Sequence, residues 1–180
     1  MSVSTVTQSE IVTPRLRLRR LQQRDAGLIA LYASDPRVAR ATSVIPHPYP
    51  PGAAEAFVAR VLGQGARETV WALDTGPDDG NGLIGLISLK PCGEGLAEIG
   101  YWVAPAFWGT GFASEAVEAL VGHAVGSRTL VAEVFQDNPA SARVLMHAGF
   151  TYEGEGEIHS LARAGMVPTF RYRRAAGGRA

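Results

Sequence analysis

The sequence has a single cysteine, no net charge and no long apolar run, and each of these excludes a class of protein. Cys92 is the only cysteine among 180 residues, so the chain forms neither an internal disulfide nor a cysteine cluster for metal, and a reducing cytoplasm is expected. The formal net charge is zero, so we expect neither DNA nor a membrane surface as a partner. No apolar run approaches the roughly eighteen residues that a membrane-spanning helix needs, and residues 1–10 lack the basic start and apolar run of a secretion signal.

The chain also lacks repeats, linkers and metal-ligand spacing. Its histidines lie in different predicted elements, so no metal site is expected. A length of 180 residues suits one domain with a substantial core. We expect a flexible N-terminus over residues 1–12, a single domain over 13–174 and a frayed tail over 175–180.

The hydrophobic pattern predicts a mixed α+β domain. Three consecutive apolar segments, 69–74, 83–90 and 96–103, are separated by turn residues and indicate successive antiparallel strands. After them, helical and strand patterns alternate toward the C-terminus, which favours a sheet covered by helices. Further strands are predicted at 15–21, 129–135, 150–156 and 169–175. Helices are predicted at 23–34, 53–65, 114–125 and 138–149, with a further short helix starting at Pro36.

The segment FWGTGFASEA, residues 107–116, places Gly109 and Gly111 just before a predicted helix. Free N–H groups at a helix start, together with the helix dipole, favour a bound anion such as a phosphate. A turn that only permits tight backbone geometry is the alternative. The P-loop pattern is absent, and a dinucleotide fingerprint fits poorly because residues 105–108 separate the glycines from the preceding strand.

Strand 96–103, the glycine loop and the following helix resemble the acetyl-CoA-binding core of the GCN5-related N-acetyltransferase (GNAT) family. Its loop has the form [QR]-x-x-G-x-[GA], and here Trp108 replaces the leading Gln or Arg. Residues 138–150, NPASARVLMHAGF, resemble a later element of the family that runs from an asparagine to Gly-Phe. Residues 13–41 resemble the opening of the subgroup that acetylates ribosomal-protein N-termini (RimJ/RimL type).

This resemblance implies a central, mostly antiparallel, twisted sheet of about six to seven strands flanked by helices. It also implies acetyl-CoA as the donor and direct attack by a primary amine in a ternary complex. The Val103 backbone N–H is expected to hold the thioester oxygen. The cofactor-binding residues that it implies are Val103, Trp108, Gly109, Thr110, Gly111, Phe112, Ala113, Ser114, Asn138 and Ser141.

The resemblance further implies two catalytic side chains. Glu98, within an otherwise apolar strand, is expected to take a proton from the amine, either directly or through water; the alternative is a solvated or ion-paired glutamate. Many family members have a proton-donating tyrosine where this chain has Leu145. Ser141 is the replacement donor, unless it only hydrogen-bonds the helix backbone. Asn138 is expected to cap the helix and to contact the pantetheine arm.

Acceptor choice is expected to depend on loops 43–52 and 155–168. A protein N-terminal amine is the leading acceptor, with a polyamine, amino acid or antibiotic amine as the alternative. A catalytically idle acyl-CoA-binding regulatory domain is a rival of another class. Strand 169–174, if exposed, would let the chain pair with a copy of itself as a homodimer.

Overall fold

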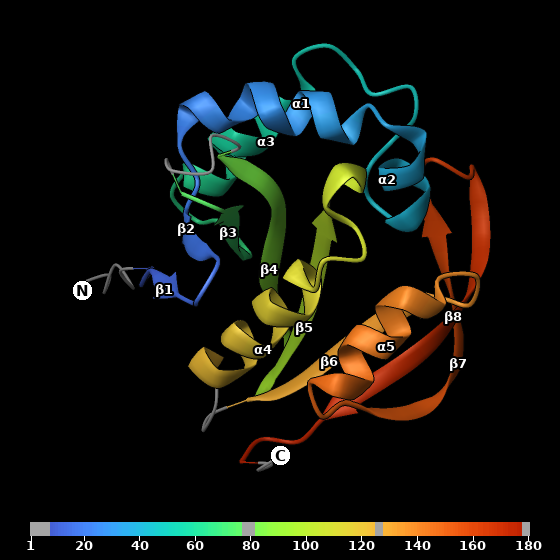
Figure 1. Cartoon of the computed structure of the whole chain (residues 1–180). Helices are drawn as coiled ribbons and strands as arrows, with labels where there is room; N and C mark the ends of the chain where they lie inside the picture. Colours follow the sequence, from blue (N-terminus) through green and yellow to red (C-terminus); the bar gives the residue numbers. More distant parts are fainter. Residues whose placement is uncertain (1–7, 77–81, 125–127, 178–180) are drawn as a thin grey trace.

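The computed structural model describes residues 8–76, 82–124 and 128–177. Its strands form one eight-stranded sheet in the order β1-β2-β3-β4-β5-β6-β8-β7 (Figure 1). Every neighbouring pair is antiparallel except β5 and β6, which are parallel. The strands are β1 (Ile11–Val12), β2 (Arg17–Arg20), β3 (Thr69–Asp74), β4 (Leu83–Gly93), β5 (Leu96–Val103), β6 (Thr129–Phe135), β7 (Thr151–Ser160) and β8 (Gly165–Arg174).

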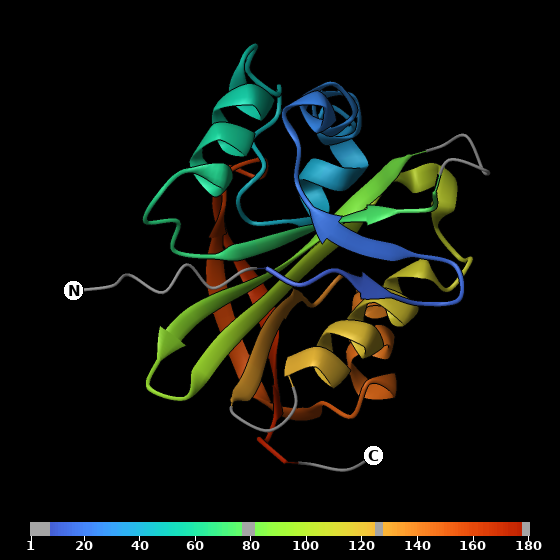
Figure 2. The ribbon, with the colours of Figure 1, turned by 90° about the vertical axis from the view of Figure 1, so that its left-hand side faces the viewer.

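Helices cover both faces of this sheet. Figure 2 shows α1, α2 and α3 on one side and α4 and α5 on the other. Among the described residues, no helix is both long and apolar enough to cross a membrane. The helices are α1 (Ala26–Ala33), α2 (Pro36–Ala41), α3 (Ala53–Leu62), α4 (Phe112–Ala124) and α5 (Pro139–His147), with short 3-10 turns η1 (Gln23–Asp25) and η2 (Pro105–Phe107).

The alternation of side chains along β3 explains why the sheet has a core on each face. Trp71 and Leu73 belong to the core that α4 and α5 cover, whereas Val70 and Ala72 belong to the core that α1 and α3 cover. Successive residues of a strand point to opposite faces. The continuous apolar run in this strand therefore serves two cores, and it fits a central strand buried on both sides.

The sheet begins closer to the N-terminus than the sequence suggests. Residues 1–12 were expected to be flexible; residues 1–7 of this segment lie outside the described residues, and Ile11 and Val12 form β1 and pair with β2. The Trp71 indole N–H also donates to the Ser9 carbonyl at 3.1 Å. The sheet consequently has eight strands, where six to seven were expected, because a two-residue strand is too short to show any alternation.

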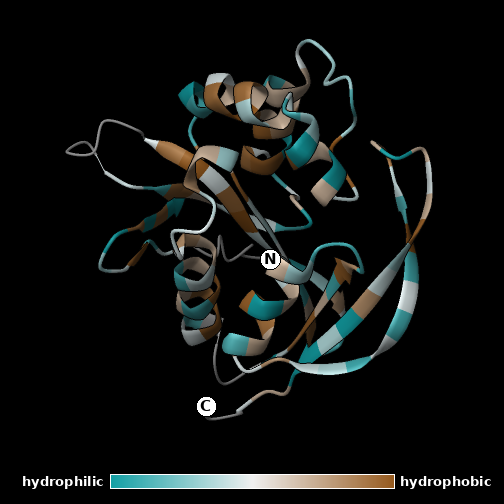
Figure 3. Ribbon diagram, turned by 45° about the vertical axis from the view of Figure 1, so that its right-hand side comes forward, coloured by the Kyte–Doolittle hydropathy of each residue, from teal (hydrophilic) through white to brown (hydrophobic). Residues whose placement is uncertain are grey.

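The C-terminal hairpin is more regular than predicted. Segment 155–168 was expected to be a loop, yet β7 extends through Ser160 and β8 begins at Gly165, so only a four-residue turn separates the strands. Many hydrophilic residues lie along both strands (Figure 3). Strand 169–174 is also not an edge, because β8 lies between β6 and β7. The homodimer predicted through that strand therefore has no free edge there.

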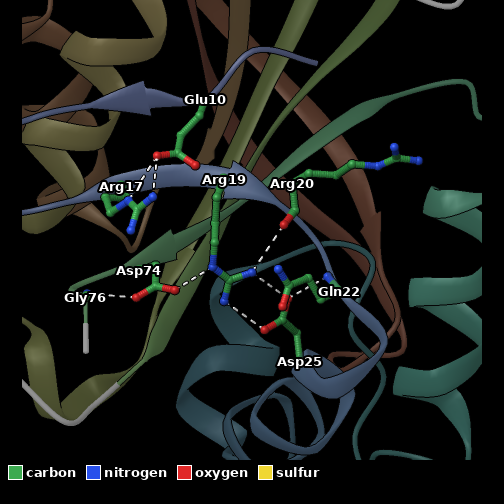
Figure 4. Close-up of polar contacts among 8 residues, drawn as sticks. All are labelled: Glu10, Arg17, Arg19, Arg20, Gln22, Asp25, Asp74 and Gly76. Atoms are coloured by element: carbon green, nitrogen blue, oxygen red, sulfur yellow. Dashed lines mark hydrogen bonds and ion pairs between the residues drawn. The ribbon is translucent and has the colours of Figure 1, made fainter. Parts of the chain in front are cut away.

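Close to β2 and β3, a group of charged side chains is fully paired (Figure 4). The Arg19 guanidinium donates to both carboxylate oxygens of Asp25, at 2.8 and 2.9 Å, and to Asp74. The Gln22 N–H donates to Asp25 at 2.7 Å, and the Gly76 N–H donates to Asp74 at 2.8 Å. We call Arg19, Asp25 and Asp74 the Arg19 cluster; it joins the η1 turn to the sheet.

Candidate active site

The sheet separates at the boundary between β5 and β6. Their parallel pairing covers only three positions and ends at Glu98 and Val131. Beyond that point β5 continues with β4, while β6 turns away with β8 (Figure 1). The five C-terminal residues of β5 therefore have a neighbouring strand on one side only. Separation of paired strands in the middle of a sheet leaves room for a ligand.

A groove of about 530 Å³ lies on the α4–α5 side of this separation. We call it the first cavity. The end of β5 and the following loop form one wall, the first turn of α4 forms the end, and α5 forms the other wall. Most of the residues predicted to bind the cofactor line this groove: Val103, Trp108, Gly109, Gly111, Phe112, Ala113, Ser114, Asn138 and Ser141. The remaining one, Thr110, donates its hydroxyl hydrogen to the Phe107 carbonyl within the loop.

The glycine loop presents backbone N–H groups to the groove. Gly109 and Gly111 have φ angles of +73° and +85°, which side-chain-bearing residues rarely adopt. Helix α4 begins directly after Gly111, two residues earlier than predicted. The first helical hydrogen bond runs from the Glu115 N–H to the Gly111 carbonyl, so the N–H groups of the preceding three residues have no partner inside the helix. Unpartnered N–H groups at a helix start favour a bound anion without the help of a cationic side chain.

Trp108 fastens the loop to the sheet. Its indole N–H donates to the Val103 carbonyl at 2.7 Å, although the side chain is about half exposed, at 48%. The guanidinium of Arg37 lies 5.7 Å from the centre of its ring. Where the family pattern has Gln or Arg, this chain therefore has an aromatic residue that fixes the loop position.

A second attachment of the loop comes from the N-terminal segment, to which no such role was assigned from the sequence. The Glu115 carboxylate accepts hydrogen bonds from the Thr13 hydroxyl at 2.6 Å and the Arg15 N–H at 2.8 Å. The Arg15 guanidinium pairs with the same carboxylate and donates to the Thr110 carbonyl at 2.8 Å. Burial alone would raise the pKa of Glu115, but these hydrogen bonds outweigh it and keep the pKa below its ordinary value. The Glu115 carboxylate thus stays ionised and positions Arg15, which in turn contacts the loop at the Thr110 carbonyl.

The backbone of Val103 faces the separation. The Ala104 N–H donates to the Ile84 carbonyl of β4 at 2.8 Å. Because successive N–H groups of a strand point to opposite sides, the Val103 N–H points away from β4, toward the side that β6 has left. This direction fits a donor for a ligand oxygen in the groove.

Ser141 and Tyr101 meet across the groove. Their hydroxyl oxygens are 2.8 Å apart, and Tyr101 also lies 3.1 Å from the Ser141 carbonyl oxygen. Burial raises the pKa of Tyr101 to about 12, so its hydroxyl stays protonated at neutral pH. The Asn138 side chain caps α5 by accepting from the Ser141 N–H at 3.2 Å, which confirms the predicted cap. Leu145, at the position of the family's tyrosine, is fully buried in the core.

A second cavity, of about 910 Å³, lies on the other side of the separation. Glu98 lines it and is partly buried, but its carboxylate has no hydrogen bond or ion pair to any residue that the structure describes. Two other glutamates of the lining, Glu68 and Glu133, are paired with arginines at 2.9 Å. Glu98 is therefore the one carboxylate of this lining that remains available.

The two cavities share a small set of residues. Tyr101 and Trp102 point to opposite faces of the sheet, since Tyr101 packs on the core under α4 and α5 and Trp102 packs on the other core. Both nevertheless line both cavities. The residues common to the two linings are Ala41, Tyr101, Trp102, Asn138 and Ser141.

The two segments expected to select the acceptor, 43–52 and 155–168, lie against each other. The Leu161 N–H donates to the Ser43 carbonyl at 3.0 Å. Tyr49 of the first segment lines the second cavity. Within the described ranges, no three His, Cys, Asp or Glu residues gather in a way that could hold a metal ion.

Comparisons with known proteins agree with this arrangement. A family model described as an acetyltransferase (GNAT) domain matches residues 15–151. The chain is 33% identical over 159 residues to YoaA, an uncharacterized N-acetyltransferase of Bacillus subtilis (strain 168), with 79% of this chain and 82% of that protein covered. It is 40% identical over 78 residues to the ribosomal-protein-serine acetyltransferase of Escherichia coli (strain K12), with 40% of this chain and 43% of that protein covered.

Among solved structures, the fold matches RimL, a ribosomal L7/L12 alpha-N-protein acetyltransferase determined in complex with coenzyme A. The TM-score is 0.80 at 20% identity, with 94% of this chain and 99% of that chain covered. The chain belongs to the GNAT acetyltransferase family. The mixed sheet flanked by helices that the sequence predicts is the fold of this family.

Proposed function

We propose that the protein transfers the acetyl group of acetyl-CoA to a primary amine, and that the acceptor is a protein N-terminal amine. The similarity to the ribosomal-protein-serine acetyltransferase supports the N-terminal acceptor. The observation that carries acetyl transfer is the meeting of the two cavities at Tyr101 and Ser141. A groove with an anion site at one end opens there into a second cavity that holds an available carboxylate. Donor and acceptor can thus approach each other from opposite sides of the sheet and meet there, and direct transfer in a ternary complex requires this proximity.

The first cavity suits acetyl-CoA because its anion site is made of backbone N–H groups. In our proposal the N–H groups of residues 109–114 hold the pyrophosphate, and Asn138 contacts the pantetheine arm. Bound there, acetyl-CoA supplies a thioester whose carbonyl carbon forms the new C–N bond as the C–S bond breaks. In our proposal the Val103 N–H donates to the oxygen that becomes negative during this exchange.

Glu98 is our candidate for the general base. An alkyl amine is protonated at neutral pH and must lose a proton before its nitrogen can attack. A carboxylate with no other partner can accept this proton, either directly or through a bound water molecule. The paired carboxylates of the same cavity, Glu68 and Glu133, are less suited because their charges already neutralise arginines.

Ser141 is our candidate for protonating the departing sulfur. The single Tyr101 hydroxyl hydrogen has two acceptors in reach, the Ser141 carbonyl oxygen and the Ser141 hydroxyl oxygen. In our proposal it is donated to the closer hydroxyl oxygen during the transfer, which leaves the Ser141 hydrogen free to point into the groove. Tyr101 can then replace the proton that Ser141 gives up, because its raised pKa keeps it protonated. Tyr101 thus has a role that the sequence alone did not assign to it.

A thiol-release assay tests this function. The protein is mixed with acetyl-CoA and a short peptide with a free N-terminus, and free CoA is followed with a thiol-reactive dye. We expect release with the free peptide, acetylation of its α-amine by mass spectrometry, and no release with the same peptide blocked at its N-terminus. Equal release with the blocked peptide would indicate thioester hydrolysis. Binding of acetyl-CoA without release by any peptide, spermidine or amino acid would indicate an idle acyl-CoA-binding domain.

A further inference from the structure

Lys90 is the only lysine in the chain. It is exposed and lines the second cavity, in which we propose that the acceptor amine binds. Its side chain forms no hydrogen bond or ion pair with any residue that the structure describes. A lysine carries a primary amine, which is the chemical group that the proposed reaction consumes. The acceptor cavity therefore contains an amine that belongs to the protein itself.

The register of β4 and β5 places Lys90 beside Glu98. The two residues are directly opposite each other in this antiparallel pair, so their Cα atoms lie about 5 Å apart. Their side chains point to the same face of the sheet, on which Leu86 and Trp102 pack in the core under α1 and α3. The Lys90 amine and the candidate base therefore start from one row of the cavity floor.

The length of the lysine side chain lets its amine approach the donor. Tyr101 lines both cavities and lies three residues beyond Glu98 on β5, roughly 10 Å along the strand. Lysine carries its nitrogen on a flexible four-carbon stem, which is longer than the glutamate side chain. An acceptor nitrogen that Glu98 deprotonates must come near its carboxylate, and the Lys90 nitrogen, starting from the same row, is able to occupy that place.

We propose that Lys90 is a self-acetylation site, at which the protein transfers the acetyl group of acetyl-CoA to its own Nζ atom. This inference rests on the proposed function, because it uses the same donor and the same base. One proton of the ammonium passes to Glu98 and on to water, and the nitrogen bonds to the carbonyl carbon as the C–S bond breaks. The nitrogen then loses a second proton, which balances the one that Ser141 gives to the sulfur. The products are acetyl-lysine, CoA and one released proton.

Mass spectrometry of the intact and digested protein tests the proposal. The full chain is incubated with acetyl-CoA and no other acceptor, and the addition of one acetyl group is followed over time. The matched control is Arg24→Lys, which adds a lysine at an exposed position that lines neither cavity. We expect Lys90 to be acetylated at least about tenfold faster than the introduced lysine, because only Lys90 is held near the donor. Glu98→Gln should slow acetylation of Lys90 about 100-fold.

Two further measurements exclude other routes to the same product. Cys92 is exposed and close to Lys90 in sequence, so an acetyl group taken up by its sulfur can pass to the lysine nitrogen. Cys92→Ser should therefore leave the rate unchanged if the transfer is direct. Dilution of the protein should also leave the rate constant unchanged, because donor, base and amine belong to one complex. Loss of the modification in Cys92→Ser, or a slower reaction on dilution, would overturn the proposal.

The peptide assay separates this proposal from the proposed function. Equal acetylation of Lys90 and the introduced lysine would overturn self-acetylation, because uncatalysed chemistry would explain both. An unmodified Lys90 in a protein that acetylates a peptide would overturn it as well, and the proposed function would stand. Saturating amounts of that peptide should protect Lys90, since both amines use the second cavity. The proposed function fails instead if the protein acetylates neither Lys90 nor any added amine.

Discussion

Two groups of charged side chains in this molecule differ in how their charges are satisfied. In the Arg19 cluster each charge has an opposite partner, and Asp25 is 3% exposed. Around the second cavity, Glu98 and Lys90 have no partner among the described residues. A paired, buried charge stabilises the fold only as long as its partner remains. An unpaired charge that lines a cavity is available to a ligand, which is why we assign the first group to stability and the second to function.

The largest effect should follow from breaking the paired group. Arg19→Met leaves Asp25 buried without a counterion, so we expect the free energy of unfolding to fall by about 3–5 kcal/mol. Urea unfolding measures this loss. Arg17→Met on the same strand is the control, because its pair with Glu10 is exposed and should be worth at most about 1 kcal/mol. A similar small loss in both variants would refute the role given to the Arg19 cluster.

Substitution of the unpaired Glu98 carboxylate should instead reduce activity and leave stability unchanged. Glu98→Gln should lower kcat about 100-fold or more, the usual contribution of a general base. Its unfolding free energy should stay within about 0.5 kcal/mol of the wild type, because no contact is lost. Acetyl-CoA affinity should also be unchanged. The thiol-release assay measures kcat, urea unfolding measures stability and calorimetry measures acetyl-CoA affinity, with exposed Glu118→Gln as the control. A kcat within about twofold of the wild type would exclude Glu98 as the base.

The Arg15–Glu115 ion pair combines features of the two groups, because its charges are satisfied by each other and Arg15 also contacts the glycine loop at Thr110. We expect Arg15→Met and Glu115→Gln each to cost about 1 kcal/mol of stability and to weaken acetyl-CoA binding about threefold. Since both residues act through one contact, the double variant should be little worse than either single variant. Additive losses in binding would show that the two residues act independently of each other.

The smallest expected effect is the pH dependence of the stability that Asp74 contributes. Burial would raise the pKa of Asp74, but hydrogen bonds from Arg19 and the Gly76 N–H outweigh it and hold the pKa below its ordinary value of 3.8. A carboxyl whose pKa is lower in the folded state stabilises the fold above its unfolded pKa and loses this effect as pH falls through its folded pKa. Asp74→Asn should therefore cost about 1 kcal/mol at pH 6, and this cost should shrink below about pH 4. Urea unfolding across this range tests it; a cost independent of pH would contradict the assignment.

Local sequence was enough to predict the parts of the site that lie within one element and its flanking loop. The positive φ angles at Gly109 and Gly111 and the cap at Asn138 follow from short-range chemistry. Contacts between distant segments gave no such signal. Tyr101 and Ser141 are 40 residues apart, and Arg15 and Glu115 are 100 residues apart. Only the packing of helices on a particular sheet order brings these pairs together.

The strand order explains the other differences. Segment 155–168 of the last hairpin was predicted as a loop because its glycines have no side chain and interrupt the alternation of apolar and polar residues that indicates a strand. Pairing with β8 over the whole length of β7 supplies backbone hydrogen bonds that the side-chain pattern does not reveal. The separation of β5 from β6, which creates the site, is likewise a property of the sheet and not of either strand.

The most direct test of the account is the thermal unfolding midpoint of the wild type with and without acetyl-CoA. A ligand at a hundred times its dissociation constant stabilises the folded state by about 2.7 kcal/mol. For a chain of this length the midpoint should rise by roughly 5–11 °C, whereas NAD at the same concentration should leave it unchanged. No rise at saturating acetyl-CoA would contradict the claim that the groove between β5, α4 and α5 binds this donor.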